Sequence, residues 1–383
     1  MKRERMVDIA HRMLHLIDTK STDLAPTTFE VPLDRYTSPE VFRRERQVLF
    51  GETPMFLGMS NEIREPGAYF TRDIVDTPFL CLRDKSGAAR LFLNSCRHRG
   101  AKVATELCGT TDRFHCPFHA WTYELDGKLC FVPDSDAFDD MEWEKRGLIE
   151  LPVAEKYGMI FGCATPGTKI DIDELLGGLA PEFEEWGFDD YIMHGEPHVH
   201  SGEGNWKYCW DTFCENYHIA YLHANTGASI VVSRRMAYDN YGRNVRMVSA
   251  MQSIREMRQQ PEDEWVPEKH LSIQYRLYPA VNFTCFPGFM TVYWVMPGRT
   301  PSEARALHIT YLSRMPEDPA ELARIDHGIQ VGCEDIVEKE DFWITALSEA
   351  AMHSPAAQPT FVMGRNEPAL QHFNRLYAEA IER

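Results

Sequence analysis

Hydrophobic positions in the first part of the chain follow two different periods. Residues 6–17 place Met, Val, Ile, Ala and Leu at helical spacing before the polar segment 21–23, which predicts a short amphipathic helix. Between about 55 and 165 the apolar runs are short and separated by turn residues, which predicts strands and hairpins. These runs cover residues 55–59, 67–74, 78–84, 89–96, 121–132 and 159–165. Asp126-Gly127 predicts a type I′ hairpin turn, in which both central residues have positive φ.

The second half of the chain predicts a mixture of helices and strands. An acidic helical segment lies near 168–190 and joins the two halves, and a second helix is expected at 205–222. Apolar and aromatic strands follow between 271 and 314, and a long helix from about 318 to 352. This order predicts an α+β fold in which a long C-terminal helix packs on an antiparallel sheet.

Three segments follow from these patterns. Residues 1–40 contain an N-terminal helix that we expect to pack on the C-terminal domain, residues 41–165 an all-β domain, and residues 166–383 an α+β domain. The 383-residue length agrees with two or three domains at roughly 150 residues each.

Composition excludes several classes of protein. Hydrophobic residues at 44% and charged residues at 26% are typical of a globular chain. A net charge of -18 makes nucleic acid a poor partner, because phosphate binding needs clustered Lys and Arg. No apolar run reaches the roughly 18 residues of a membrane span, and the N-terminus lacks the apolar core of a signal peptide. We therefore expect a cytoplasmic protein that binds no membrane, and no disulfide framework among its ten cysteines.

Two cysteines and two histidines form the first candidate site. Cys96 precedes His98 in a C-x-H pair, and Cys116 precedes His119 in a C-x-x-H pair. Each pair follows a predicted strand, so two loops could present four ligands to one place. Thiolate and imidazole suit zinc or an iron–sulfur centre. Structural zinc is the main alternative, although zinc sites more often use C-x-x-C pairs.

The sequences CRHRGAKV and CPFHAWTYELDGKL resemble the Rieske signature of ring-hydroxylating and related non-haem iron oxygenases. Arg99-Gly100, Trp121 and Gly127 belong to the resemblance, whereas Ala120 stands where glycine is usual. The resemblance implies a Rieske [2Fe–2S] cluster. Its ligands would be Cys96, His98, Cys116 and His119.

A second candidate site lies in the predicted helix at 205–222. Glu215 and His218 would share one helix face, whereas His218 and His223 would lie about 140° apart on a regular helix. The two histidines could bind one metal only if the helix widens into a π-turn or ends between them. Judged by spacing alone, His218 and His223 would more often be two buried, hydrogen-bonded histidines than two metal ligands.

The segment ENYHIAYLH resembles the mononuclear iron motif of the same family and implies that His218 and His223 bind Fe(II) with a later carboxylate. In the family that carboxylate is an Asp on the long C-terminal helix, and GCEDIVE resembles this segment. Asp335 is our first choice for the third ligand. The alternatives are Glu334, Glu338 and Asp341. Without the resemblance, this segment would be an exposed acidic helix face.

Glu215 stands where the family has a bridging carboxylate, commonly Asp, between an iron-ligand histidine and a Rieske histidine of the neighbouring subunit. Carboxylates in such positions orient metal-bound imidazoles. Asp211 is the competing candidate, one helical turn upstream. Glutamate in this role resembles family members that act on quaternary ammonium compounds.

The late strands are rich in aromatic residues, most of which we expect in the core. Some could line an apolar cavity for an aromatic substrate or, through cation–π contacts, for a trimethylammonium group. The candidates are Phe283, Phe286, Phe289, Met290, Tyr293, Trp294 and His308.

Together the resemblance implies the terminal component of a Rieske oxygenase with a helix-grip catalytic domain. It would use O2 and electrons from NAD(P)H, delivered by a separate reductase with or without a ferredoxin, and would form a homotrimer. Its substrate would be aromatic or otherwise apolar, with oxidative demethylation of a quaternary ammonium compound as the alternative. The rival class is an electron-transfer or zinc-binding protein in which only the first site functions.

Overall fold

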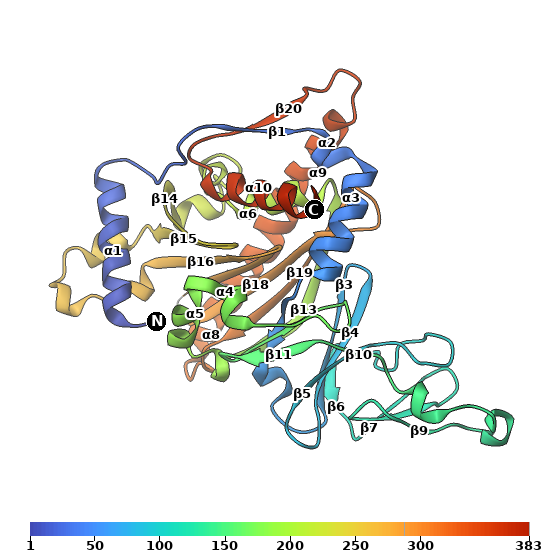
Figure 1. Ribbon diagram of the computed structural model, residues 1–383. Coiled ribbons are helices and arrows are strands. Elements are labelled where there is room, and N and C mark those ends of the chain that lie inside the picture. Colours follow the sequence, from blue (N-terminus) through green and yellow to red (C-terminus); the bar gives the residue numbers. More distant parts are fainter. Residues whose placement is uncertain (287, 383) are drawn as a thin grey trace. The chain divides into compact units, whose positions relative to one another are not determined.

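The computed structural model describes residues 1–286 and 288–382. The chain forms two compact units (Figure 1). The larger unit comprises Met1–Arg46, Leu176–Trp186 and Ile192–Arg383, and the smaller comprises Gln47–Leu175 and Gly187–Tyr191. The sequence placed these divisions after residues 40 and 165, a few residues before the chain passes between the units.

The smaller unit consists of three antiparallel sheets, as its short apolar runs predict. Five strands follow the order β10 (Glu150–Leu151), β5 (Ala89–Leu93), β4 (Thr77–Arg83), β3 (Ala68–Ile74) and β6 (Cys108–Thr110). The other two sheets contain β11 (Val153–Lys156), β12 (Met159–Gly162) and β2 (Met55–Met59), and β7 (Arg113–His115), β8 (Thr122–Glu124) and β9 (Leu129–Phe131). Each of the six predicted runs contains a strand.

The predicted hairpin at Asp126-Gly127 is confirmed as β8–β9, but its turn is not type I′. Only Gly127 of this pair has positive φ, at 83°. The Gly127 N–H donates to Glu124 C=O at 2.9 Å, and the Glu124 N–H donates to Lys128 C=O at 2.9 Å. This is a three-residue turn in which one glycine supplies the left-handed conformation.

Two loops of the smaller unit have the same backbone geometry. The Cys96 N–H donates to Ala101 C=O at 2.8 Å, and the Gly100 N–H returns to Cys96 C=O at 2.9 Å. The second loop repeats this pattern. Its Cys116 N–H donates to Trp121 C=O and its Ala120 N–H to Cys116 C=O, both at 2.9 Å. Gly100 and Ala120 are therefore equivalent, and both have positive φ, at 82° and 53°.

The larger unit is built on a seven-stranded antiparallel sheet. Its order is β13 (Ile192–Glu203), β19 (Glu303–Leu312), β18 (Phe289–Pro297), β17 (Val281–Phe286), β16 (Leu271–Leu277), β15 (Asn244–Met251) and β14 (Val231–Tyr241). The four strands predicted between 271 and 314 are confirmed as β16 to β19. Strands β13, β14 and β15 were not predicted, and β1 (Phe29–Pro32) pairs separately with β20 (Thr360–Met363).

Helices cover this sheet. The predicted N-terminal helix is α1 (Arg3–Asp18), which packs on β14 and β15. The acidic segment forms α4 (Ile172–Leu176) and α5 (Ala180–Trp186). Shorter helices are α2 (Asp34–Thr37), α3 (Pro39–Glu45) and α7 (Ile254–Met257), and α10 is Pro368–Glu382. No helix among residues 1–286 and 288–382 is long and apolar enough to cross a bilayer.

Two helical predictions need comment. The helix expected at 205–222 is wrong in length, because α6 (Trp206–Phe213) ends before Glu215. The long C-terminal helix is confirmed as a continuous helical stretch, but it is not uniformly α-helical. A π-helix, η11 (Val331–Asp341), lies between α8 (Pro319–Gln330) and α9 (Phe342–Met352).

The start of α6 is fixed by buried polar groups. The Asn205 side chain accepts from the Lys207 N–H at 3.0 Å and so caps the helix. Lys207 Nζ lies 2.8 Å from Glu45 Oε2, and both side chains are almost completely buried. Trp206 Nε1 donates to the same carboxylate oxygen at 3.0 Å. Glu45 therefore ties α6 to α3 while neutralising a buried ammonium group.

We predict that Glu45→Ala lowers the free energy of unfolding of the larger unit by about 3–5 kcal/mol, because it leaves the Lys207 ammonium buried without its counter-ion. Urea unfolding followed by tryptophan fluorescence measures this loss. Arg43→Ala is the control, since it breaks only the exposed Arg43–Glu40 pair and should cost less than about 1 kcal/mol. Equal losses in the two variants would contradict the role of Glu45.

We predict that Ala120→Gly stabilises the second loop by about 1 kcal/mol, because it relieves an alanine held in the left-handed region. Hydrogen exchange of the amides in 113–132 should become about fivefold slower. Gly100→Ala, at the equivalent position, should have the opposite effect on its own loop. Unchanged or faster exchange in Ala120→Gly would contradict this interpretation.

Candidate functional site

The two loops of the smaller unit bring like ligands together. Cys96 and Cys116 are buried, with 3% and 4% exposure, and burial followed by the hydrogen bond to Cys96 raises the pKa of Cys116. The imidazoles of His98 and His119 lie edge to face, with ring centroids 4.8 Å apart. The thiols thus form one pair and the imidazoles another, which is the division that a Rieske cluster requires, with two cysteines on one iron and two histidines on the other.

A single zinc ion fits this arrangement less well. Among the described residues, no three of these four side chains place ligand atoms within 4.8 Å of one another, as one tetrahedral ion would require. His119 Nδ1 is buried without a hydrogen-bond partner, whereas its Nε2 lies 2.9 Å from Arg99 Nη2. One ring nitrogen is therefore available for an iron.

Aromatic neighbours hold the cluster loops. The Tyr123 hydroxyl lies 3.3 Å from Cys96 Sγ and accepts the Arg97 N–H at 2.9 Å. Burial raises the pKa of Tyr123, so the hydroxyl keeps its proton and can donate it to sulfur. Trp121 stacks on His98 with ring centroids 4.8 Å apart and an interplanar angle of 7°. Hydrogen bonds to sulfur and restricted solvent access tune the reduction potential of such clusters.

The second site lies in the larger unit, where the chain leaves α6. His218 begins a short 3-10 helix, η7 (His218–Ala220), so neither histidine lies on a regular α-helix. His218 Nε2 and His223 Nε2 are 3.1 Å apart. The separation of about 140° that a regular helix through residue 222 would impose on His218 and His223 therefore does not apply.

Asp341 completes the group around the two histidines. Its Oδ1 lies 3.3 Å from His223 Nε2 and 3.8 Å from His218 Nε2. This oxygen is buried and makes no hydrogen bond to any described residue. Two imidazole nitrogens and a buried carboxylate oxygen without a partner form a donor set that suits a mononuclear iron.

Asp335, our first choice for the third ligand, lies elsewhere on the same π-helix. Its carboxylate pairs with Lys339 at 2.7 Å and is 40% exposed. The buried residues of η11 are Cys333, Val337 and Asp341, spaced four apart. The structure therefore places Asp341, one of the stated alternatives, where Asp335 was expected.

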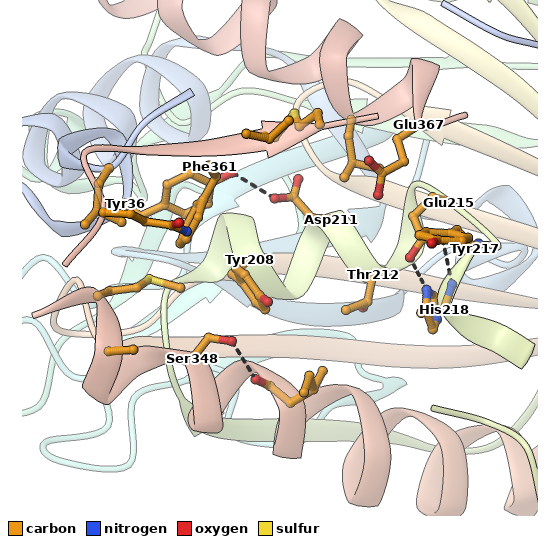
Figure 2. A pocket seen from close by; sticks show the side chains of 18 of the residues that line it. Tyr36, Tyr208, Asp211, Thr212, Glu215, Tyr217, His218, Ser348, Phe361 and Glu367 are labelled. Carbon is orange, nitrogen blue, oxygen red and sulfur yellow. Dashed lines mark hydrogen bonds and ion pairs between the residues drawn. The ribbon is translucent and has the colours of Figure 1, made fainter. Parts of the chain in front are cut away.

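A carboxylate holds the outer nitrogen of each imidazole. Glu215 Oε1 is hydrogen-bonded to His218 Nδ1, and its other oxygen accepts the His218 N–H at 3.1 Å (Figure 2). Glu340 Oε2 lies 2.7 Å from His223 Nδ1 and also accepts the Thr226 hydroxyl at 2.8 Å. These bonds place the proton on each Nδ1 and leave each Nε2 lone pair free toward Asp341. This role of Glu340 was not predicted, because its spacing in the sequence does not distinguish it from the other acidic residues of η11.

Asp211, the rival of Glu215, contacts a different set of groups. It accepts the Tyr36 hydroxyl at 2.8 Å and points away from His218, which lies beyond the C-terminal end of α6 (Figure 2). Burial raises the pKa of Asp211 to about 8, so the carboxyl is mostly protonated at neutral pH. It therefore lacks both the position and the charge of a bridging carboxylate.

Glu215 and His218 lie between two cavities of the larger unit. An inner cavity of about 350 Å3 extends from His223 and Asp341 to the sheet. An outer cavity of about 1220 Å3 is bordered by α6, α9 and β20 (Figure 2). Both cavities are lined by Glu215 and His218.

The sheet contributes both aromatic and polar residues to the inner cavity. Of the aromatic candidates, Phe286, Phe289 and Tyr293 line it, whereas Phe283, Met290 and Trp294 are core residues. His308 borders a separate cavity instead. Six polar residues of the sheet also line this cavity and were not predicted. They are Ser272, Gln274, Arg276, Asn282, Thr284 and Thr291. The alternation of apolar and polar residues in LSIQYRL and VNFTCF could have indicated the first five.

Named proteins resemble the chain over much of its length. The oxygenase subunit of glycine betaine monooxygenase from Chromohalobacter salexigens is 31% identical over 52% of this chain, but the match spans only 44% of that subunit. The oxygenase subunit of carnitine monooxygenase from Acinetobacter baumannii is 26% identical over 68% of this chain and 70% of that subunit. Chlorobenzene dioxygenase subunit alpha from a Cupriavidus species is 29% identical over 48% of this chain and 42% of its own.

A solved quaternary ammonium Rieske monooxygenase, in complex with L-carnitine, has the same fold. The TM-score is 0.76 at 20% identity, over 94% of this chain and 96% of that one.

Two family models match the chain in succession. The Rieske [2Fe-2S] domain model matches residues 53–149, and the model for the catalytic domain of the ring-hydroxylating alpha subunit matches residues 188–383. The second match covers half of the chain, and the order of the two agrees with the two sites described above. The chain therefore belongs to the ring-hydroxylating alpha-subunit family of Rieske oxygenases.

Proposed function

We propose that the protein is the terminal oxygenase component of a Rieske system that oxidises a quaternary ammonium compound. The observation that supports an oxygenase most directly is the buried group of His218, His223 and Asp341 at the inner cavity. An electron-transfer or zinc-binding protein would have no need of this second group. Electrons from NAD(P)H would arrive through a separate reductase, with or without a ferredoxin.

The ligand assignments are part of this proposal. Cys96, His98, Cys116 and His119 would hold the [2Fe–2S] cluster, and His218, His223 and Asp341 the mononuclear iron. When bound, the two groups would together reduce and activate O2 beside the substrate.

The chain's own residues prepare the second site for this chemistry. Glu215 and Glu340 are hydrogen-bonded to the Nδ1 atoms of His218 and His223, which fixes the orientation of both rings and directs each Nε2 toward Asp341. Phe213, Phe286 and Tyr293 line the cavity and would give a substrate apolar, aromatic surroundings.

The relatives favour a quaternary ammonium substrate over the aromatic one that we first expected. Two of the relatives reported above are named for glycine betaine and carnitine. Glu215, where Asp is common, points to the same class. The aromatic cavity walls suit a trimethylammonium group through cation–π contact. Oxygen consumption coupled to product analysis, with quaternary amines tested beside aromatic acids and hydrocarbons, tests this choice; product from aromatic compounds alone would contradict it.

We further propose a homotrimer in which Glu215 couples His218 to the Rieske centre of a neighbouring subunit. The outer cavity supports this arrangement, because Glu215 and His218 line it beside the exposed rings of Tyr217 and Tyr221. An exposed aromatic surface beside the site suits contact with another protein.

We predict that Asp341→Ala removes one iron per chain of the about three that the two centres require, while the Rieske visible spectrum remains. The reason is the loss of the one buried carboxylate facing both Nε2 atoms. Iron analysis and absorption spectroscopy measure the two outcomes. Asp335→Ala is the matched control and should keep all of the iron; loss of iron in this variant instead would return the ligand role to Asp335.

We predict that Glu215→Gln slows reoxidation of the reduced Rieske centre by at least about tenfold, because the amide removes the negative charge beside His218 Nδ1 and leaves one acceptor oxygen in place of two. Stopped-flow absorption of the cluster measures this rate in the presence of substrate and O2. Asp211→Asn is the control, since that carboxyl is already mostly neutral. An unchanged rate in Glu215→Gln, with iron content preserved, would remove its coupling role.

A further inference from the structure

Arg276 forms a buried cationic patch in the floor of the inner cavity. It lies on β16, is 3% exposed and borders the cavity with Gln274 and Asn282. Its Nη2 donates to Gln274 Oε1 at 2.6 Å, and its Nη1 donates to Asn282 Oδ1 on the neighbouring strand β17. Both acceptors are neutral amides.

No carboxylate of the described chain forms an ion pair with this guanidinium. The group acting on it electrostatically is the Cys214 thiol, and burial raises the pKa of Cys214 well above its usual value, so the thiol is neutral. Burial lowers the pKa of Arg276 to about 10, which still leaves the side chain charged at neutral pH. A buried cation without a counter-ion is costly and is rarely kept unless something binds it.

A structural role accounts for only part of this arrangement. Phe213 C=O, at the C-terminus of α6, accepts from Arg276 Nε at 2.6 Å and also from Nη2. A helix C-terminus offers roughly half a negative charge. This contact explains one edge of the guanidinium but does not neutralise it, and it does not explain why the charge borders the cavity beside a proposed iron site.

We infer that Arg276, with Gln274 and Asn282, forms a subsite for the carboxylate of the substrate. This inference rests on the proposed function and narrows it: the substrate is a quaternary ammonium carboxylate, rather than an amino alcohol or an uncharged ring. Arginine binds carboxylates with charge-assisted hydrogen bonds. The acceptors described above leave one N–H of Arg276 Nη1 for the substrate. The aromatic wall of the same cavity would hold the methylated nitrogen.

Charge balance within the cavity supports this choice. A quaternary ammonium ion without a carboxylate would place a second cation in the cavity of about 350 Å3 that already holds Arg276. The carboxylates that line this cavity, Glu215 and Asp341, lie at the two histidines and form no ion pair with Arg276. Like charges in a low dielectric repel strongly. A zwitterion adds no net charge to the cavity, and its carboxylate can pair with Arg276.

Binding to the metal-loaded enzyme tests the inference without turnover. Isothermal titration calorimetry would use glycine betaine, γ-butyrobetaine and L-carnitine, each beside its methyl ester, which keeps the trimethylammonium group and removes the negative charge. We expect the wild type to bind at least one carboxylate tenfold or more tightly than its ester. In Arg276→Gln the carboxylate should bind at least tenfold more weakly, and the ester within about twofold of its wild-type affinity.

Asn282→Asp is the second variant, because it keeps Arg276 and its contact with α6 but supplies a carboxylate from the protein. It should abolish the preference for the free carboxylate. Equal weakening of acid and ester in Arg276→Gln, a preserved preference in Asn282→Asp, or a wild type that binds none of the three carboxylates would overturn the inference. Failure of the proposed function would appear separately, as no O2-dependent product from a compound that binds.

Discussion

The geometry of the mononuclear site depends on two hydrogen bonds between carboxylates and imidazoles. Glu215 holds His218 and Glu340 holds His223, each at Nδ1. An imidazole fixed at one nitrogen can present the other in only one direction, and both Nε2 atoms meet at Asp341. Without these bonds the two rings could rotate apart, since the loop that follows α6 has little regular structure to hold them.

Asp341 faces this pair because it lies on the buried side of η11, which it shares with Cys333 and Val337. Residues four apart share one side of a helix, and this spacing separates Asp341 from the more exposed Asp335. In η11 every fourth residue from Cys333 faces inward, and Asp341 is the last of them before α9 begins. Helical widening of this kind often marks a functional site. Helical periodicity could have indicated Asp341, which lies four residues after Val337 and eight after Cys333 on the same side of the helix. The choice of Asp335 rested on the family resemblance and not on this spacing.

The sequence-based predictions were confirmed where the local pattern of apolar residues is enough to determine a strand or a helix. Short apolar runs located the strands of the smaller unit, and the helical spacing of 6–17 located α1. They failed where distant contacts decide the structure. The strands β13 to β15 are less apolar and depend on pairing with neighbours, and α6 ends after Phe213, whose carbonyl bonds Arg276 from β16. The polar floor of the inner cavity was also missed: the alternation in LSIQYRL and VNFTCF marks one face of the sheet as polar, but it does not show that this face borders a cavity.

Residues along β16 alternate between two environments, and substitutions in the two environments have different effects. Ser272, Gln274 and Arg276 border the inner cavity, whereas Ile273, Tyr275 and Leu277 between them are buried in the core. Substitutions in the first set alter which molecule fits, and those in the second alter whether the sheet packs. A lineage with this fold can therefore change its substrate by altering every second position of one strand while the scaffold stays intact.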